Sequence, residues 1–281
     1  MYARPTARLN SLRLKRLSIR EKLAPTSASG QNLPSAHYVQ THLTLATALT
    51  RSIYDPVSTA QLSSAEGATQ VILVRHGESR AASAENPFPL VGGHGDPELH
   101  ANGEQQAEMV GERLKGEDID AIYVTDLQRT QQTAAPLCRH LGLTPIVEAG
   151  LKEVFLGEWE GGIMRIRAAA GDPIFTQMQE QQRWDVIPGA ESWETLNTRV
   201  IAGLTRIHKA HPNQKVVAVV HGGVIGHIIA KASGAQPFAF NGADNGSISR
   251  IVINGDEIKV RAFNDNAHVN STLHDGSGQL T

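Results

Sequence analysis

The sequence predicts an α/β fold that is built around a mostly parallel β-sheet. Three short, almost entirely apolar runs indicate strands of the sheet core, because strands that are buried on both faces lack polar alternation. These strands are expected at Gln70–Val74, Ala121–Val124 and Lys215–Val220. Segments with the apolar spacing of helices lie between them, and strands that alternate with helices are typical of parallel sheets.

The first strand runs directly into Arg75 and His76. Open α/β sheets bind their ligands at the carboxyl ends of the strands, so this pair is expected beside a ligand. Arginine presents a planar, charged fork that fits phosphate oxygens, and a neutral imidazole can attack phosphorus through its free lone pair. Taken alone, however, an arginine beside a histidine is more often ordinary polar structure.

A second strand ends in the same way, which strengthens the first signal. Lys215–Val220 is followed by His221 and Gly222, and a helix is expected from Gly222 to Ala232. Two parallel strands that each deliver a histidine followed by a glycine place both histidines at one edge of the sheet. The sequence therefore predicts a crevice that His76 and His221 share.

The middle strand leads into a further cationic residue. Asp126 is expected to cap a helix from Gln128 to Leu141 that ends at Gly142, because a side-chain oxygen can satisfy the free amides of a helix start. Arg129 would then lie in the first helical turn, near the same edge of the sheet. The loop 151–161 follows and supplies three candidate carboxylates, Glu153, Glu158 and Glu160.

The remaining elements complete the predicted domain. Asn102 with Gln105 is expected to cap a helix that runs through Leu114. A terminal hairpin is expected around Asn254 and Gly255, because such a pair favours a tight turn between two strands. The other expected elements are a helical lid insert at 163–184, a helix at 191–211, and the two hairpin strands at 247–253 and 258–263.

Together these pieces resemble the histidine phosphatase superfamily, also called the phosphoglycerate mutase-like family, from about Gln70 to Ala267. The resemblance implies a three-layer α/β/α sandwich of the phosphoglycerate mutase-like kind. It also implies that His76 is a nucleophile that forms a phosphohistidine and that Glu153 is the proton donor. The residues that it assigns to the phosphoryl group and substrate are Arg75, Arg129, His221 and Gly222.

These roles agree with the chemistry of the side chains. Arg75 and Arg129 keep their charge at working pH and can stabilise the charge that spreads over a phosphoryl group in flight. His221 would contribute in the same way only if nearby anions favoured its protonated form. Glu153 would protonate the leaving oxygen and later take a proton from water. Its choice over Glu158 and Glu160 rests on the position of the motif.

The local motif resembles the phosphatase branch of the family more than its mutases. A leucine, one residue and a glutamate precede Gly-x-Trp-Glu-Gly at 151–161, where mutases carry a basic cluster. Mutases also have a tryptophan-asparagine pair where this chain has Arg80–Ser83, so one expected phosphate ligand is missing. The candidates to replace that asparagine are Arg80, Ser83 and Asn86.

The sequence thus favours a metal-independent phosphomonoester hydrolase that needs no cofactor and acts on a small phosphorylated metabolite. A phosphoglycerate mutase and a non-catalytic phosphate-binding scaffold are the alternatives. Specificity is expected from the loop 80–100 and the insert 163–190, neither of which identifies the substrate. The sequence leaves the oligomeric state open, with a homodimer as one alternative.

A metal site is a further alternative, because His94, Asp96 and His100 lie in one loop and their side chains are of the kinds that bind zinc. Their loop lacks a regular spacing that would aim the three side chains together, so a metal role is disfavoured. The neighbouring glycines, Gly92, Gly93 and Gly95, indicate a mobile loop beside the site.

Composition excludes several classes of protein. The 281 residues carry a formal net charge of -2, so no basic excess points to nucleic acid. Cys138 is the single cysteine, which leaves no internal disulfide and no sign of an oxidising compartment. No apolar run has the length that a bilayer requires, and a cytoplasmic location is expected.

The predicted domain covers residues 69–268. Residues 1–68 are rich in Arg, Ser, Thr and Ala and poor in acids, which is typical of an organellar transit peptide but equally of a poorly ordered extension or an upstream start. We favour the last two interpretations. The polar residues 269–281 are expected to form an unstructured tail.

Overall fold

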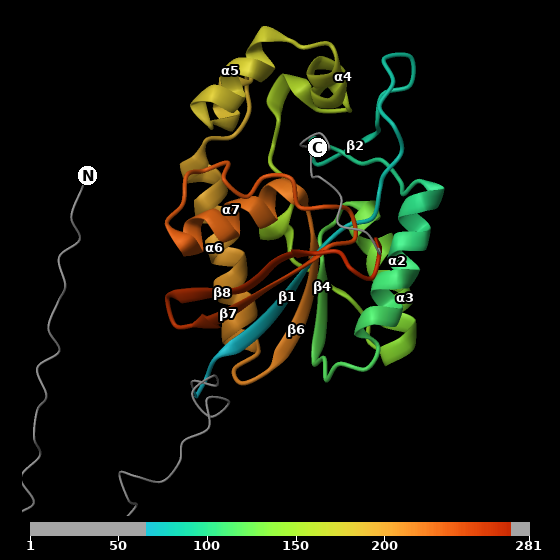
Figure 1. Cartoon of the computed structure of the whole chain (residues 1–281), viewed down its shortest axis with the longest axis vertical. Helices are drawn as coiled ribbons and strands as arrows, with labels where there is room; N and C mark the ends of the chain where they lie inside the picture. The colour runs from blue at the N-terminus through green and yellow to red at the C-terminus, as the bar shows by residue number, and fades with distance from the viewer. Residues whose placement is uncertain (1–65, 271–281) are drawn as a thin grey trace, which may run out of the picture. The chain divides into compact units, whose positions relative to one another are not determined.

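A single mixed sheet forms the centre of the computed structural model, which describes residues 66–270 (Figure 1). Its six strands lie in the order β5-β4-β6-β1-β7-β8. The first four are parallel to one another, whereas β7 is antiparallel to β1 and to β8. The strands are β1 (Thr69–Arg75), β4 (Ala121–Val124), β5 (Ile146–Val147), β6 (Lys215–Val220), β7 (Ile248–Asn254) and β8 (Glu257–Asp265). The predicted mostly parallel sheet and the terminal hairpin are confirmed.

Two layers of helices cover the sheet. Helices α2 (Ala101–Leu114) and α3 (Gln128–Leu141) lie on one side, and α6 (Trp193–Ala210) and α7 (Gly222–Ser233) lie on the other (Figure 1). Alternate residues of each strand point to opposite layers because side chains alternate along a strand. The predicted three-layer α/β/α sandwich is therefore confirmed.

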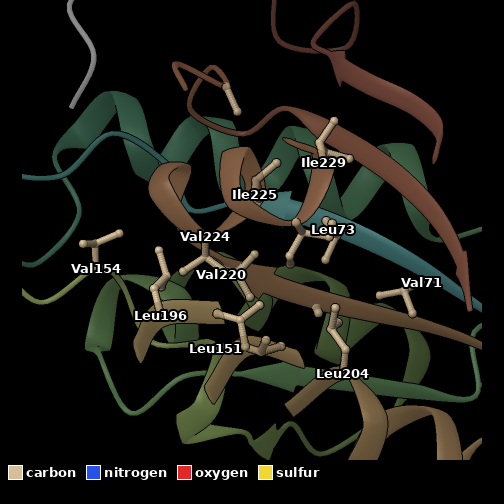
Figure 2. Packing of buried hydrophobic residues seen from close by; sticks show 14 of the residues in the cluster. Val71, Leu73, Leu151, Val154, Leu196, Leu204, Val220, Val224, Ile225 and Ile229 are labelled. Atoms are coloured by element: carbon tan, nitrogen blue, oxygen red, sulfur yellow. The ribbon is translucent and has the colours of Figure 1, made fainter. Parts of the chain in front are cut away.

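Strand β1 shows how both layers fix the site. Val71 and Leu73 pack with α6 and α7, and Figure 2 shows side chains of these elements gathered in one cluster. Ile72 and Val74 pack with α2 and α3 in the other cluster. Each fully buried aliphatic side chain contributes roughly 1.5–3 kcal/mol. Because side chains on both faces of β1 are buried, the position of Arg75 and His76 at its end is fixed.

An insert and a small hairpin lie beyond the sheet. The predicted helical insert contains α4 (Ile163–Ala169) and α5 (Pro173–Gln181), drawn at the top of Figure 1, followed by η3 (Trp184–Val186). The loop that was expected to be mobile contains a hairpin of β2 (Leu90–Val91) and β3 (His94–Gly95), and its mobility stays a prediction. Gly92 and Gly93 make its turn at φ 56° and 86°, the left-handed geometry that a two-residue hairpin turn requires.

Two predictions of helix starts are wrong. Helix α2 is capped by His100, whose Nδ1 accepts the amide of Asn102 at 3.4 Å, and not by Asn102 itself. At α3 the N-cap residue is Leu127, and Asp126 lies away from the helix amides, where it pairs with Lys152 at 2.7 Å.

The carboxylate that does satisfy α3 comes from a distant loop. Oδ1 of Asp96 accepts the amide of Gln128 at 2.8 Å. A tertiary contact has thus replaced the local cap, and neighbouring residues alone do not reveal such a contact. The predicted end of α3 at Gly142 is confirmed, with φ 67° in the left-handed region.

The predicted ends of the domain fall near the limits of the described residues. Ala68 is buried and its carbonyl accepts the amide of Asn213 at 2.9 Å, so it belongs to the folded part. The proposed extension 1–68 and tail 269–281 lie almost wholly outside the described residues and stay predictions. Between residues 66 and 270, no helix is both long enough and apolar enough to cross a membrane.

Candidate active site

The pairing of β1 with β6 brings the two histidines together. In this parallel ladder Arg75 is the partner of Val220, so His76 and His221 leave the sheet side by side. Their ring centroids are 5.2 Å apart in an edge-to-face arrangement. The predicted convergence of the two strand ends is therefore confirmed.

Hydrogen bonds define the state of the His76 imidazole. Its Nδ1 lies 2.8 Å from the carbonyl oxygen of Gly77, which can only accept, so Nδ1 carries the proton. Nε2 then keeps a lone pair and accepts from Nε of Arg129 at 3.2 Å. Burial, followed by the charges of Arg129 and Arg75, lowers the pKa of His76 well below its usual value. The imidazole is neutral, which is the form that a nucleophile needs.

Arg75 and Arg129 approach His76 from different elements. Nη1 of Arg75 donates to the carbonyl of Ala243, whereas Nη1 of Arg129 donates to that of Gly95 at 2.9 Å. Burial lowers the pKa of each guanidinium to about 10. Both groups therefore stay charged at neutral pH.

Gly222 allows Arg75 to lie against the start of α7. A Cβ atom at this glycine would come within 3.2 Å of the Arg75 Nε. That Nε is buried and has no hydrogen-bond partner among the described residues. The first turn of α7 also presents free backbone amides and the positive end of a helix dipole. The arrangement leaves this corner of the site ready for an anion.

The three candidate carboxylates separate clearly. Oε1 of Glu153 accepts the amide of Val154 at 2.9 Å, and the side chain lies over Gly223, where a Cβ atom would come within 2.8 Å of Oε1. Glu160 instead binds two backbone amides, those of Gly95 at 2.6 Å and Leu156 at 2.9 Å. Glu158 is exposed. Glu153 and Glu160 both line the cavity, and Glu153 lies against Gly223 in the first turn of α7.

One cavity, with a volume of about 120 Å³, joins these groups. The polar part of its lining includes His76, Arg75, Arg129 and Glu153, and Gly222 also lines it. The apolar part contains Phe88, Leu156, Trp159, Met164 and Trp184. The cavity therefore has one cationic part, which contains Arg75 and Arg129, and one apolar part.

His221 lies beside the His76 ring but does not reach the surface of the cavity. It is fully buried, it is not among the residues that line the cavity, and its Nε2 lies 3.1 Å from Oγ1 of Thr125. Burial, followed by the charge of Arg129, lowers its pKa well below the usual value. The surroundings of His221 thus oppose its protonated form, which is the form that could stabilise a phosphoryl group. An added anion would favour that form.

Sequence reasoning missed two residues that organise the site. Arg165 of α4 lines the cavity, and Nδ2 of Asn245 donates to the His76 carbonyl at 2.9 Å. No motif marked either residue, because both come from segments without a regular pattern. Arg80, Ser83 and Asn86, the candidates for the missing phosphate ligand, are not among the residues that line the cavity.

The alternative metal ligands have structural roles. Asp96 caps α3, His100 caps α2, and the His94 ring packs edge-to-face against Phe155 with centroids 5.3 Å apart. Across residues 66–270, no three His, Cys, Asp or Glu side chains gather in a way that could hold a metal ion.

Comparisons with known proteins agree with this geometry. The family model of the histidine phosphatase superfamily (branch 1) matches residues 71–266. A Bacillus subtilis (strain 168) protein named uncharacterized phosphatase PhoE is 30% identical over 207 residues, which cover 73% of this chain and 99% of the relative. Phosphoglycerate mutase-like protein 4 of Arabidopsis thaliana is 33% identical over 218 residues, which cover 74% and 91%. The crystal structure of the alpha-ribazole phosphatase from Shigella flexneri matches with a TM-score of 0.57 and 25% identity, over 70% of this chain and 96% of that one.

Proposed function

This chain belongs to the histidine phosphatase superfamily, and we propose that it hydrolyses a small phosphorylated metabolite through a phosphohistidine at His76. The observation that carries the proposal is the neutral His76 imidazole, whose Nε2 lone pair lies beside Arg129 in the shared cavity. Phosphatases among its relatives support hydrolysis as the reaction class.

In the first step, the Nε2 lone pair of His76 attacks phosphorus while the bond to the leaving oxygen breaks. Arg75 and Arg129 stabilise the negative charge on the equatorial oxygens, which is greatest in the transition state. Glu153 gives its proton to the leaving oxygen, so the alcohol departs neutral. The products are the alcohol and an N-phosphorylated His76.

In the second step, water attacks the phosphorus and the bond to Nε2 breaks. Glu153, now a carboxylate, takes the proton of the attacking water and returns to its starting form. The imidazole regains its lone pair and inorganic phosphate leaves. His76 and Glu153 act in both steps and line the same cavity, so one cavity serves the whole cycle.

We assign His221 a supporting role in the same site. Its Nδ1 is buried without a hydrogen-bond partner among residues 66–270. A phosphoryl group near His76 would raise the pKa of His221, since a nearby anion favours the imidazolium. A protonated Nδ1 could then donate to a phosphoryl oxygen.

Two arginines and the start of α7 supply positive charge that a bound metal would otherwise provide, so we propose a metal-independent reaction.

A phosphoglycerate mutase is the second candidate, because one similar protein bears a mutase-like name. The mutase motif is absent after Glu153, where Trp159, Glu160 and Gly161 follow. The presence of His76, Arg75, Arg129 and Glu153 in one cavity argues against a scaffold. The cytoplasmic location stays a prediction.

A panel of phosphorylated metabolites, assayed with and without a chelator, tests the proposal. We expect release of inorganic phosphate that the chelator leaves unchanged and that exceeds any interconversion of phosphoglycerates. His76→Ala should lower turnover by about 10³-fold or more, as loss of other nucleophiles does. Acid-labile, base-stable phosphate should be trapped on the wild type alone. Full activity of His76→Ala would disprove the mechanism.

A further inference from the structure

Arg165 reaches the catalytic cavity from the insert, far along the chain from the phosphate-binding motifs. It lies on α4 and lines the same cavity as His76. Its Nη2 donates to Oγ of Ser79 at 2.9 Å, and its Nη1 donates to the carbonyl of Arg80 at 3.0 Å. These two partners follow His76 by only a few residues, so the guanidinium is tied to the nucleophile loop.

Packing holds this arginine in place. The guanidinium carbon lies 5.3 Å from the centroid of the Phe88 ring, a cation-π contact. Gly162, just before α4, has φ 99°, and a Cβ atom there would come within 3.0 Å of both Ala82 and Phe88. The helix start therefore presses closely against the loop after His76. Arg165 is a positioned cation and not a freely moving surface side chain.

No carboxylate pairs directly with the Arg165 guanidinium among the described residues. The charge of Arg165 lowers the pKa of Arg75, Arg129 and His76, which places it within electrostatic range of all three. Burial lowers the pKa of Arg165 itself, and the nearby carboxylates of Glu153 and Glu78 oppose that shift. Like charges that share one cavity repel each other unless an anion compensates them.

We propose that Arg165 is a third arginine that binds the transferred phosphoryl group, so that the helical insert completes the catalytic site. The proposal rests on the proposed phosphatase function and adds a residue to it. The cavity lining holds three arginines, Arg75, Arg129 and Arg165, against two glutamates, Glu153 and Glu160, so the arginines outnumber the carboxylates. The phosphoryl group of the substrate supplies the anion that the three guanidinium groups attract.

The test compares Arg165→Met with Arg165→Lys and with Arg167→Met. Arg167 is a matched control, because it lies on the same helix but is exposed, pairs with Asp172 and does not line the cavity. Each variant is assayed for hydrolysis of p-nitrophenyl phosphate and of phosphoserine, which carries an extra carboxylate. The inhibition constants of inorganic phosphate and orthovanadate are measured in parallel, and the melting temperatures report on folding.

Removal of one preorganised donor typically lowers kcat by about 10²–10³-fold. We expect such a loss in Arg165→Met for both substrates, together with a rise of at least about tenfold in the inhibition constant of orthovanadate. Arg165→Lys should recover part of the loss, because it restores the charge, and Arg167→Met should match the wild type. The lysine variant also serves as the test if the methionine variant fails to fold.

Two outcomes overturn the proposal. Unchanged kinetics and unchanged anion inhibition in Arg165→Met would show that the side chain does not touch the phosphoryl group. A loss confined to phosphoserine would assign Arg165 to a second anion on the leaving group. If the wild type hydrolysed no phosphomonoester, the proposed function would fail instead. Direct calorimetry of phosphate binding to wild type and Arg165→Met would still decide the role of Arg165.

Discussion

Nε of Arg129 donates to Nε2 of His76 at 3.2 Å, and Nε2 is the atom that attacks phosphorus in the proposed mechanism. The lone pair of the proposed nucleophile is therefore occupied by a residue to which the same mechanism assigns the phosphoryl group. An incoming phosphoryl oxygen can accept the Arg129 hydrogen bond in place of Nε2, because both are acceptors. Substrate binding would thus free the nucleophile at the moment when phosphorus arrives.

The first prediction concerns this contact. Arg129→Met removes the largest charge effect on His76, so its pKa should rise toward the usual value of about 6.5. We expect kcat/KM to fall by about 10²-fold or more, since a donor to the phosphoryl group is lost. The imidazole is followed by NMR titration of the free enzyme. A His76 titration that does not move would show that Arg129 leaves its proton affinity unchanged.

A second prediction separates the carboxylates. Glu153→Gln cannot donate a proton, so kcat/KM for an alkyl phosphate should fall by about 10²–10⁴-fold. The loss should be smaller for p-nitrophenyl phosphate, whose leaving group needs no proton. Glu158→Gln is the matched control, because this side chain is exposed and does not line the cavity. The second step is common to both substrates, so the comparison uses kcat/KM, which reports the first step. Equal losses of kcat/KM on both substrates would remove Glu153 from the role of donor.

The third prediction tests which carboxylate starts α3. Asp96→Ala removes the acceptor of the Gln128 amide and should lower the free energy of unfolding by about 1–2 kcal/mol. Asp126→Ala removes only the partly exposed pair with Lys152, which is worth about 1 kcal/mol or less. Urea denaturation of the two variants measures both values. A larger loss of unfolding free energy in Asp126→Ala than in Asp96→Ala would show that Asp126 caps α3.

The fourth prediction concerns acid stability. The ring of His227 packs against Trp193, and burial lowers its pKa from 6.5 to about 4. The unfolded chain therefore binds a proton at this residue below about pH 6.5, while the folded protein resists it down to about pH 4. Falling pH then favours unfolding, and the free energy of unfolding should drop by about 2 kcal/mol between pH 7 and pH 5 on account of His227.

His227→Phe keeps a ring against Trp193 but cannot titrate. Its free energy of unfolding should fall less than that of the wild type between pH 7 and pH 5, by about the same 2 kcal/mol. Denaturation curves at the two pH values give the difference. His76 and His221 titrate in both proteins, so their effects cancel in the comparison. If the unfolding free energies of the two proteins fell by the same amount between pH 7 and pH 5, the pKa of His227 would not be lowered in the folded protein.

The sequence predicted the parts of the fold that follow from local patterns. Continuous apolar runs located β1, β4 and β6, and the residues at their ends located His76 and His221. It failed where a distant contact decides the outcome. Asp96 caps α3 across a loop, and Arg165 enters the cavity from the insert. Neither residue differs locally from an ordinary surface side chain, so only the folded chain reveals what it does.

The parallel ladder between β1 and β6 also bears on how the enzyme acquires its activity. His76 and His221 are far apart in the sequence, with β4, α3 and α6 between them, and they meet only when this ladder forms. Pairings between distant segments close large loops and are slow to form during folding. A slip of one residue would turn every side chain of the strand to the opposite face. Regain of activity during refolding should therefore report the correctly registered sheet, and the collapsed chain that precedes it should be inactive.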